Sequence, residues 1–95
     1  MKNPTVYILA SKKNGTLYIG VTSDPVKRIH EHKNRVIDGF TKRYNCTLLV
    51  YYEQHATMES AIVREKQLKE RSRKTKIMLI ERTNLQWDDL YRNIL

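Results

Sequence analysis

Glu65 is a carboxylate placed in the middle of an apolar seam. In the segment MESAIVREKQLK, the apolar residues Met58, Ala61, Ile62 and Leu68 recur at helical spacing, and the seam that they define passes through position 65. A carboxylate taken out of water destabilises a fold by several kcal/mol unless a cation, a metal ion or hydrogen-bond donors meet it. The position therefore predicts a specific partner for Glu65.

Two kinds of partner stay open for this carboxylate. Glu65 can lie at the edge of the seam and pair with Lys69 or Arg28, which is a structural role. It can also hold a hard divalent cation such as Mg²⁺, which keeps most of its waters and often needs only one or two carboxylates plus a phosphate oxygen. In the second interpretation, Glu65 takes part in a reaction on phosphate groups.

Tyr7 and Tyr18 flank an Asn14-Gly15 pair, the strongest short signal for a β-hairpin. With a two-residue turn, Tyr7 lies opposite Thr22, and both tyrosines occupy the face that does not carry the main apolar residues. Gly20 lies between them on that face and leaves a shallow space. The tyrosines are either ordinary sheet packing or two walls of one site.

Arg28 and His32 are four residues apart in DPVKRIHEHKNR, so a helix places them on one ridge. The ridge borders the buried side of that helix, and it is either a solvated basic surface or part of a site. His30 and His32 point to nearly opposite sides of a helix, so they cannot share one metal ion. The chain has no H-E-x-x-H motif.

The elements that must position these residues alternate between strand and helix signals. Strands are predicted over residues 5–11, 16–22 and 46–54, and helices over 25–35, 57–73 and 75–83. Asp24 or Ser23 is the expected N-cap of the first helix, and Thr57 that of the second. The order β-β-α-β-α-α begins with a hairpin and predicts an α+β fold whose sheet is at least partly antiparallel. A C-terminal segment is expected to cover the core with Leu85, Trp87, Leu90 and Ile94.

The chain is strongly basic. Its 95 residues hold 18 Lys and Arg against 10 Asp and Glu, a formal charge of +8. Such a surface favours nucleic acid first and anionic lipid second, although the basic helix lacks the apolar face expected at a membrane. Tyr44 can stack on a base or pack under its loop. The residues predicted to bind the nucleic-acid backbone are Lys12 and Lys13 at the hairpin tip, Lys42 and Arg43 in the loop before the third strand, and Lys66, Lys69 and Arg73 in the following helix.

Cys46 is the only cysteine, so neither an intrachain disulfide nor a cysteine-based zinc site can form. A single thiol suits a reducing compartment. The N-terminal apolar run is too short for a signal peptide, and no window approaches the ~20 apolar residues of a membrane-spanning helix. We expect a soluble cytoplasmic protein of one domain with no membrane partner.

Several of these residues together resemble the signature of the GIY-YIG nuclease domain. The resemblance rests on the order and spacing of TVY at residues 5–7, YIG at 18–20, Arg28, His32, Glu65 and Asn84, and it covers nearly the whole chain. More narrowly, the chain resembles the small single-domain bacterial members of that superfamily. It departs from the pattern in having Thr-Val-Tyr in place of Gly-Ile-Tyr, although the tyrosine is kept.

The resemblance implies a three-stranded antiparallel sheet flanked by helices, in one domain over residues 1–95. It also implies metal-dependent hydrolysis of phosphodiesters. In that chemistry Glu65 would hold Mg²⁺ or Mn²⁺, and Arg28 would hydrogen-bond the phosphate with its planar fork. Asn84 would position a residue or the scissile strand, unless it is simply a helix C-cap.

The general base is a choice between tyrosine and histidine. The resemblance favours Tyr7 or Tyr18 as base or water-positioner, with His32 orienting the tyrosine or relaying its proton. An unperturbed tyrosine has a pKa of about 10, so reaching about 7 needs roughly 4 kcal/mol of phenolate stabilisation. On energetics alone His32 is the simpler base, because its unperturbed pKa is near 6.5.

Two functions follow from this sequence. The first is a backbone- or structure-directed endonuclease that nicks nucleic acid, DNA rather than RNA, as a monomer or transient dimer. The excision-repair nuclease carries the same domain, so the resemblance extends to DNA repair. The second is a catalytically weak nucleic-acid-binding module that acts with a partner protein. Glu65 in an apolar seam favours the first, because a pure binder does not need it.

Overall fold

The computed structural model describes residues 3–95 and contains one three-stranded antiparallel sheet of strand order β2-β1-β3. The strands are β1 (Thr5–Ala10), β2 (Leu17–Thr22) and β3 (Leu48–Gln54). The predicted α+β class and three-stranded antiparallel sheet are confirmed. β1 is central and all of its residues are buried, whereas β2 and β3 form the two edges.

The hairpin between β1 and β2 has a wider loop than the sequence predicts. Ser11 N donates to Thr16 O at 3.0 Å, and residues 12–15 form the loop between them. Tyr7 therefore pairs with Gly20 and not with Thr22. The register shift is two residues, and since side chains alternate with a period of two, it leaves Tyr7 and Tyr18 on the predicted face.

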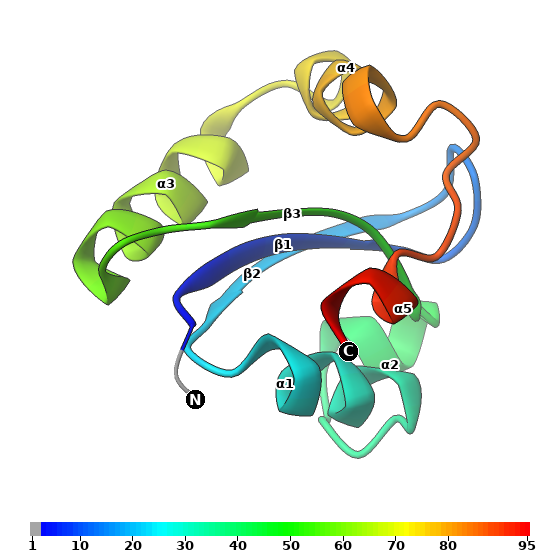
Figure 1. The fold of residues 1–95 in the computed structure, drawn as a ribbon. Helices are drawn as coiled ribbons and strands as arrows, with labels where there is room; N and C mark the ends of the chain where they lie inside the picture. The colour runs from blue at the N-terminus through cyan, green and yellow to red at the C-terminus, as the bar shows by residue number, and fades with distance from the viewer. Residues whose placement is uncertain (1–2) are drawn as a thin grey trace.

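Five helices surround the sheet: α1 (Pro25–Lys33), α2 (Phe40–Tyr44), α3 (Met58–Glu70), α4 (Arg73–Thr83) and α5 (Tyr91–Ile94). In Figure 1, α3 and α4 cover one face of the sheet, and α1, α2 and α5 lie on the other. The sequence predicts α1, α3 and α4 but not the two short helices. Lys42 and Arg43 thus lie in α2 and not in the predicted loop. The sequence does not predict this helix, because five residues are too few to show a helical period.

Predicted capping residues begin two of the helices. The side chain of Asp24 accepts a hydrogen bond from Lys27 N at α1, and that of Thr57 accepts one from Ser60 N at α3. Each removes an unpaired N–H from the first turn. None of the helices in residues 3–95 is long and apolar enough to cross a membrane.

Each face of the sheet has its own core. The face under α3 and α4 is aliphatic apart from one tryptophan, whereas the other includes a tyrosine and a thiol. Trp87 is buried as predicted, but Leu85 is 63% exposed and Ile62 is 38% exposed, so neither covers the core. The first core comprises Val6, Ile8, Ala10, Ile19, Val50, Ala61, Leu68, Ile80 and Trp87, and the second Tyr7, Leu9, Ile29, Cys46 and Leu49.

Candidate active site

Tyr7 is a buried tyrosine that lies across the neighbouring strand. It is 2% exposed. A Cβ built on Gly20 would come within 2.4 Å of its Oη and 2.5 Å of its Cζ. The space that the sequence predicts at Gly20 therefore exists, and the Tyr7 ring fills it. Position 20 must be glycine for the phenol to extend over β2, the edge strand of the sheet.

A chain of hydrogen bonds begins at the Tyr7 hydroxyl. Tyr7 Oη lies 2.9 Å from His32 Nε2, and His32 Nδ1 lies 2.9 Å from Thr41 Oγ1. His32 is 3% exposed and Thr41 is 5% exposed. In one tautomer Tyr7 donates to Nε2 while the Nδ1–H group donates to Thr41, so every polar atom of the imidazole has a partner. Below, Tyr7, His32 and Thr41 are called the tyrosine–histidine chain.

Burial and nearby charges keep this chain neutral. Burial, and then Tyr18, raise the pKa of Tyr7 well above its usual range, while Arg28 acts in the opposite direction and Glu65 adds to the rise. Burial and the positive charge of Arg28 lower the pKa of His32. At neutral pH the site therefore holds a phenol and a neutral imidazole. The charges of Arg28 and Glu65 both act on the Tyr7 hydroxyl.

Tyr18 forms the second wall of the site. Its ring centroid lies 6.3 Å from that of Tyr7 and 5.6 Å from that of His32. The rings of Tyr7 and His32 are 5.7 Å apart, so the three rings contact one another pairwise. Tyr18 is only partly buried and thus links the buried chain to the surface.

Arg28 and Glu65 reach the site from opposite faces of the sheet. Arg28 is exposed on α1, one turn before His32. Glu65 belongs to α3, which packs against β2 and β1 from the other side. Its side chain is 14% exposed and pairs with Lys69 at 3.3 Å, which is one of the two partners that the sequence left open. The site lies at the β2 edge of the sheet, where charges from both faces act on Tyr7.

Glu65 is the carboxylate whose charge acts on the Tyr7 hydroxyl, so its fit to a metal ion is the one that matters at this site. Within residues 3–95, no three His, Cys, Asp or Glu side chains gather into a ligand group. A hard cation that keeps most of its waters and takes one carboxylate and a phosphate oxygen fits this donor set, whereas a zinc site does not. The residues present are thus compatible with Mg²⁺ or Mn²⁺ at Glu65.

Comparison with known proteins settles the family. Residues 3–78 match the GIY-YIG catalytic domain. The chain belongs to the GIY-YIG family. This family is one of nucleases, which generally use divalent metals.

The GIY-YIG chain is similar to bacterial proteins of the group called UPF0213. One from Staphylococcus saprophyticus is 39% identical over 75 residues, which cover 79% of this chain and 90% of that protein. One from Pediococcus pentosaceus is 29% identical over 84 residues, covering 88% of this chain and 87% of that protein. The solution NMR structure of a UPF0213 protein from Bacillus halodurans superposes with a TM-score of 0.57 at 29% identity over 92% of each chain.

Asn84 of the GIY-YIG signature lies apart from the tyrosine–histidine chain. It caps the C-terminus of α4, and its Nδ2 donates to Val50 O at 3.1 Å and to Asp88 O at 2.9 Å. Its Oδ1 accepts from Asp88 N at 3.0 Å. Val50 belongs to β3, the edge opposite β2. The contacts of Asn84 are therefore those of a helix C-cap. Its side chain positions the turn after α4 on the sheet.

All seven basic residues predicted to bind the nucleic-acid backbone are exposed. Among residues 3–95, three of them also make side-chain hydrogen bonds or ion pairs within the protein. Lys42 pairs with Asp38 at 3.2 Å, and Lys69 pairs with Glu65. Arg73 donates to the carbonyl oxygens of Asn14 and Gly15 at 2.8 and 2.7 Å, so it fastens the hairpin loop to α4. The seven are Lys12, Lys13, Lys42, Arg43, Lys66, Lys69 and Arg73.

Sequence reasoning missed two residues of this GIY-YIG site, Thr41 and Phe40. Both come from α2, and Phe40 stacks on Tyr18 with ring centroids 6.0 Å apart. A buried imidazole needs a hydrogen-bond partner for each ring nitrogen. A buried His32 therefore indicates that a second polar side chain, such as that of Thr41, must lie beside it. The sequence does not show which hydroxyl supplies it.

Proposed function

We propose that this GIY-YIG protein is a divalent-metal-dependent endonuclease that hydrolyses phosphodiester bonds, in DNA rather than RNA. The observation that carries the proposal is the buried hydrogen bond between Tyr7 Oη and His32 Nε2, at 2.9 Å. It joins a hydroxyl that can face a substrate water to an imidazole that can accept a proton.

The tyrosine–histidine chain removes the difficulty of a tyrosine base. Burial raises the pKa of Tyr7, so a phenolate at neutral pH is even less accessible than in water. In the proposed step the attacking water oxygen bonds to phosphorus, the bond from phosphorus to the leaving oxygen breaks, and the proton of the water passes to Tyr7 Oη. The Tyr7 proton moves at the same time to His32 Nε2, and the positive charge stays on the imidazole. Thr41 holds the ring in the required orientation through Nδ1.

Arg28 and Tyr18 hold the reacting groups. Arg28 is exposed, and its planar guanidinium can donate two hydrogen bonds to the phosphate. Tyr18 forms the wall that excludes solvent on the side of the attacking water. Glu65 would hold Mg²⁺ or Mn²⁺, and the bound ion supplies positive charge to the phosphate and the leaving oxygen. Asn84 acts by positioning the turn after α4 and not by touching substrate.

The basic surface favours an enzyme that is directed by the backbone or by nucleic-acid structure. Exposed lysines and arginines bind phosphates without reading bases. One site of this size cuts one strand, so we propose nicking by a monomer or a transient dimer. A single buried thiol at Cys46 is in keeping with action in the cytoplasm.

The test is nicking of supercoiled plasmid and of labelled single-stranded and branched DNA. Wild type is compared with Glu65→Gln in Mg²⁺, in Mn²⁺ and in EDTA. Glu59→Gln is the matched control, because Glu59 is an exposed carboxylate on the same helix. Metal-dependent nicking that is lost in Glu65→Gln and kept in Glu59→Gln supports the proposal. Absence of nicking by wild type, with equal salt-sensitive binding by all three proteins, overturns it in favour of a binding module.

A further inference from the structure

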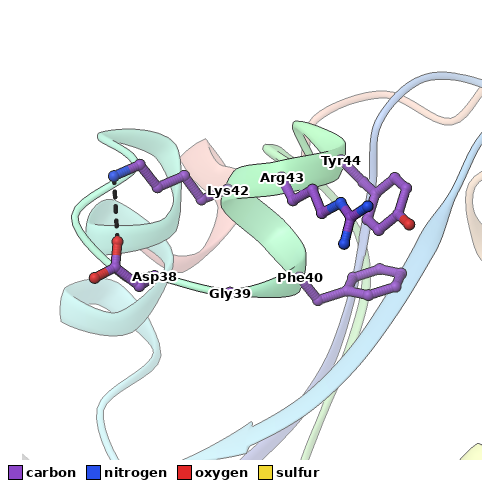
Figure 2. Close-up of a pocket in the computed structure, with 6 residues that line it drawn as sticks. All are labelled: Asp38, Gly39, Phe40, Lys42, Arg43 and Tyr44. Atoms are coloured by element: carbon purple, nitrogen blue, oxygen red, sulfur yellow. Dashed lines mark hydrogen bonds and ion pairs between the residues drawn. The ribbon is translucent and has the colours of Figure 1, made fainter.

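Helix α2 exposes two aromatic rings on one side. Phe40 is the only phenylalanine of the chain, and it is 45% exposed, while Tyr44 is 43% exposed. Their ring centroids are 4.6 Å apart. Figure 2 shows both rings pointing to the same side of α2, with the Arg43 guanidinium beside Tyr44 and Lys42 turned the other way, toward Asp38. Rings of this size are normally buried, so a pair left in solvent is a candidate binding surface.

This pair, called the α2 aromatic surface, is continuous with the candidate active site. The ring of Phe40 stacks on Tyr18 with an interplanar angle of 29°, and Tyr18 in turn contacts His32. The same short helix supplies Thr41, which holds His32. A group bound on Phe40 and Tyr44 is thus a near neighbour of the phosphate that Tyr7 and His32 would act on.

Phe40 lines two hollows, and cations line both. The hollow on the side of Tyr18 has a volume of about 260 Å³ and is also lined by Lys69 and Lys76. The hollow on the side of Tyr44 has a volume of about 670 Å³. There the Arg43 guanidinium lies 5.5 Å from the Tyr44 ring centroid. Flat rings flanked by positive charge suit a nucleotide chain, because a base can stack on a ring and a phosphate can pair with a cation.

We infer that the α2 aromatic surface stacks an unpaired nucleobase next to the phosphodiester that is cut. This inference rests on the proposed function and narrows its substrate class. In an intact duplex both faces of a base are covered by its neighbours, so only an unpaired base can stack on Phe40 and Tyr44. The preferred substrate is therefore single-stranded, bulged or flapped nucleic acid, and an uninterrupted duplex is a poor one.

Affinity in EDTA tests the inference without cleavage. Fluorescence anisotropy compares a single strand, a blunt duplex and the same duplex with one bulged nucleotide. We expect wild type to bind the single strand and the bulge about tenfold more tightly than the blunt duplex, as stacking of one base allows. Phe40→Leu keeps an apolar side chain but should lose the preference. Leu85→Ala removes an even more exposed apolar side chain outside α2 and should retain the preference.

A second variant reports stacking directly. The only tryptophan of the chain, Trp87, is 3% exposed, so bound nucleic acid should leave its emission unchanged. In Phe40→Trp, a single-stranded oligonucleotide should quench the added emission. An oligonucleotide of the same length made only of abasic sugar-phosphate units should not. This variant also keeps an aromatic ring on α2, so it retains the binding preference.

Three results would overturn the inference. The first is equal affinity of wild type for all three nucleic acids, and the second is an unchanged binding preference in Phe40→Leu. The third is self-association of wild type that Phe40→Leu abolishes, because the surface would then be a protein interface. Nicking in Mg²⁺ is measured in parallel. A preference for unpaired bases without nicking refutes the proposed function but not the stacking surface, whereas nicking without the preference refutes only the surface.

Discussion

Two clusters of polar side chains, one on each side of the molecule, join a tyrosine to a histidine. The tyrosine–histidine chain lies toward the β2 edge and has no charged member. The second cluster lies at β3 and centres on Glu53, which accepts hydrogen bonds from Tyr51 Oη at 2.8 Å, from Arg64 Nε at 3.1 Å and from His55 Nε2 at 2.8 Å. We call it the Glu53 cluster.

The difference between the clusters is the fixed charge. Burial raises the pKa of Glu53, but the hydrogen bonds from Tyr51, Arg64 and His55 outweigh it, and the net pKa of Glu53 is lowered. Burial and the same carboxylate raise the pKa of Tyr51 to about 12. Each hydrogen bond of the Glu53 cluster thus ends on a charged carboxylate, which Arg64 pairs with.

The neutral chain has no such restraint. A proton can move from Tyr7 to His32 while Tyr7 takes one from the water, and no fixed ion of the chain is neutralised. A proton transferred to Glu53 would instead neutralise the carboxylate that Arg64 pairs with. The same residue types therefore give a reactive arrangement in one place and a structural one in the other. The comparison predicts which substitutions affect activity and which affect only stability.

Removal of the Tyr7 hydroxyl should have the largest effect. In Tyr7→Phe the water has no proton acceptor, and we expect the nicking rate to fall about 10²- to 10⁴-fold. The variant should also lose roughly 1–3 kcal/mol of stability, because His32 Nε2 is left buried without a partner. Initial rates on supercoiled plasmid and urea unfolding measure the two effects separately.

Tyr51→Phe is the matched control for that change. It also removes one tyrosine hydroxyl, here a partly buried one, but Glu53 keeps Arg64 and His55 as donors. Its nicking rate should equal that of wild type. An equal loss of activity in both variants would mean that the clusters do not differ in function.

Replacement of the histidine should have the next largest effect. His32→Gln keeps groups that can hydrogen-bond to Tyr7 and Thr41 but cannot take up a proton. We expect the nicking rate to fall about 100-fold, at the lower end of general acid–base effects. His55→Gln is the control in the Glu53 cluster and should retain the wild-type rate. Full activity in His32→Gln would show that the proton leaves Tyr7 by another route.

The sequence predicts the faces of the hairpin better than its register. Alternation alone places Tyr7 and Tyr18 together, because a shift of two residues does not change faces. The loop is wider than predicted, and Arg73, far away in the sequence, binds the carbonyl oxygens of Asn14 and Gly15 in it. Local turn propensity contains no information about such a contact.

Helix α3 shows a second limit of sequence reasoning. Ala61 and Leu68 are buried as the helical spacing predicts, and the half-buried Glu65 lies between them. Ile62 is exposed because the helix rests on the sheet along a narrow stripe. Thr41 was not predictable at all, since nine residues and an irregular loop separate it from His32.

Acid should weaken both the activity and the fold through His32. The pKa of His32 is lowered in the folded protein, so between that value and about 6.5 the unfolded chain binds more protons. Stability is therefore fully present above about pH 6.5 and falls as the pH decreases below it, by at most about 1.4 kcal/mol per pH unit from this group.

Urea unfolding and nicking rates, measured on both sides of that pH, check the expectation. His32→Gln has no group that titrates there and should lose the corresponding part of the pH dependence. His55→Gln should keep it. A pH dependence that is the same in wild type and His32→Gln would assign the titration to another residue.

Neutralising Glu53 should have the smallest effect, and on stability alone. Glu53→Gln keeps a hydrogen-bond acceptor for Tyr51 but takes the counter-charge from Arg64. Since the Glu53 side chain is 22% exposed and its ion pair is partly screened, we expect a loss of about 1 kcal/mol in urea unfolding. The nicking rate should be unchanged, as in Glu59→Gln. If Glu53→Gln lost as much activity as Tyr7→Phe, the fixed charge at β3 would also support the reaction. The Glu53 cluster would then be reactive as well, and its assignment as a structural cluster would be wrong.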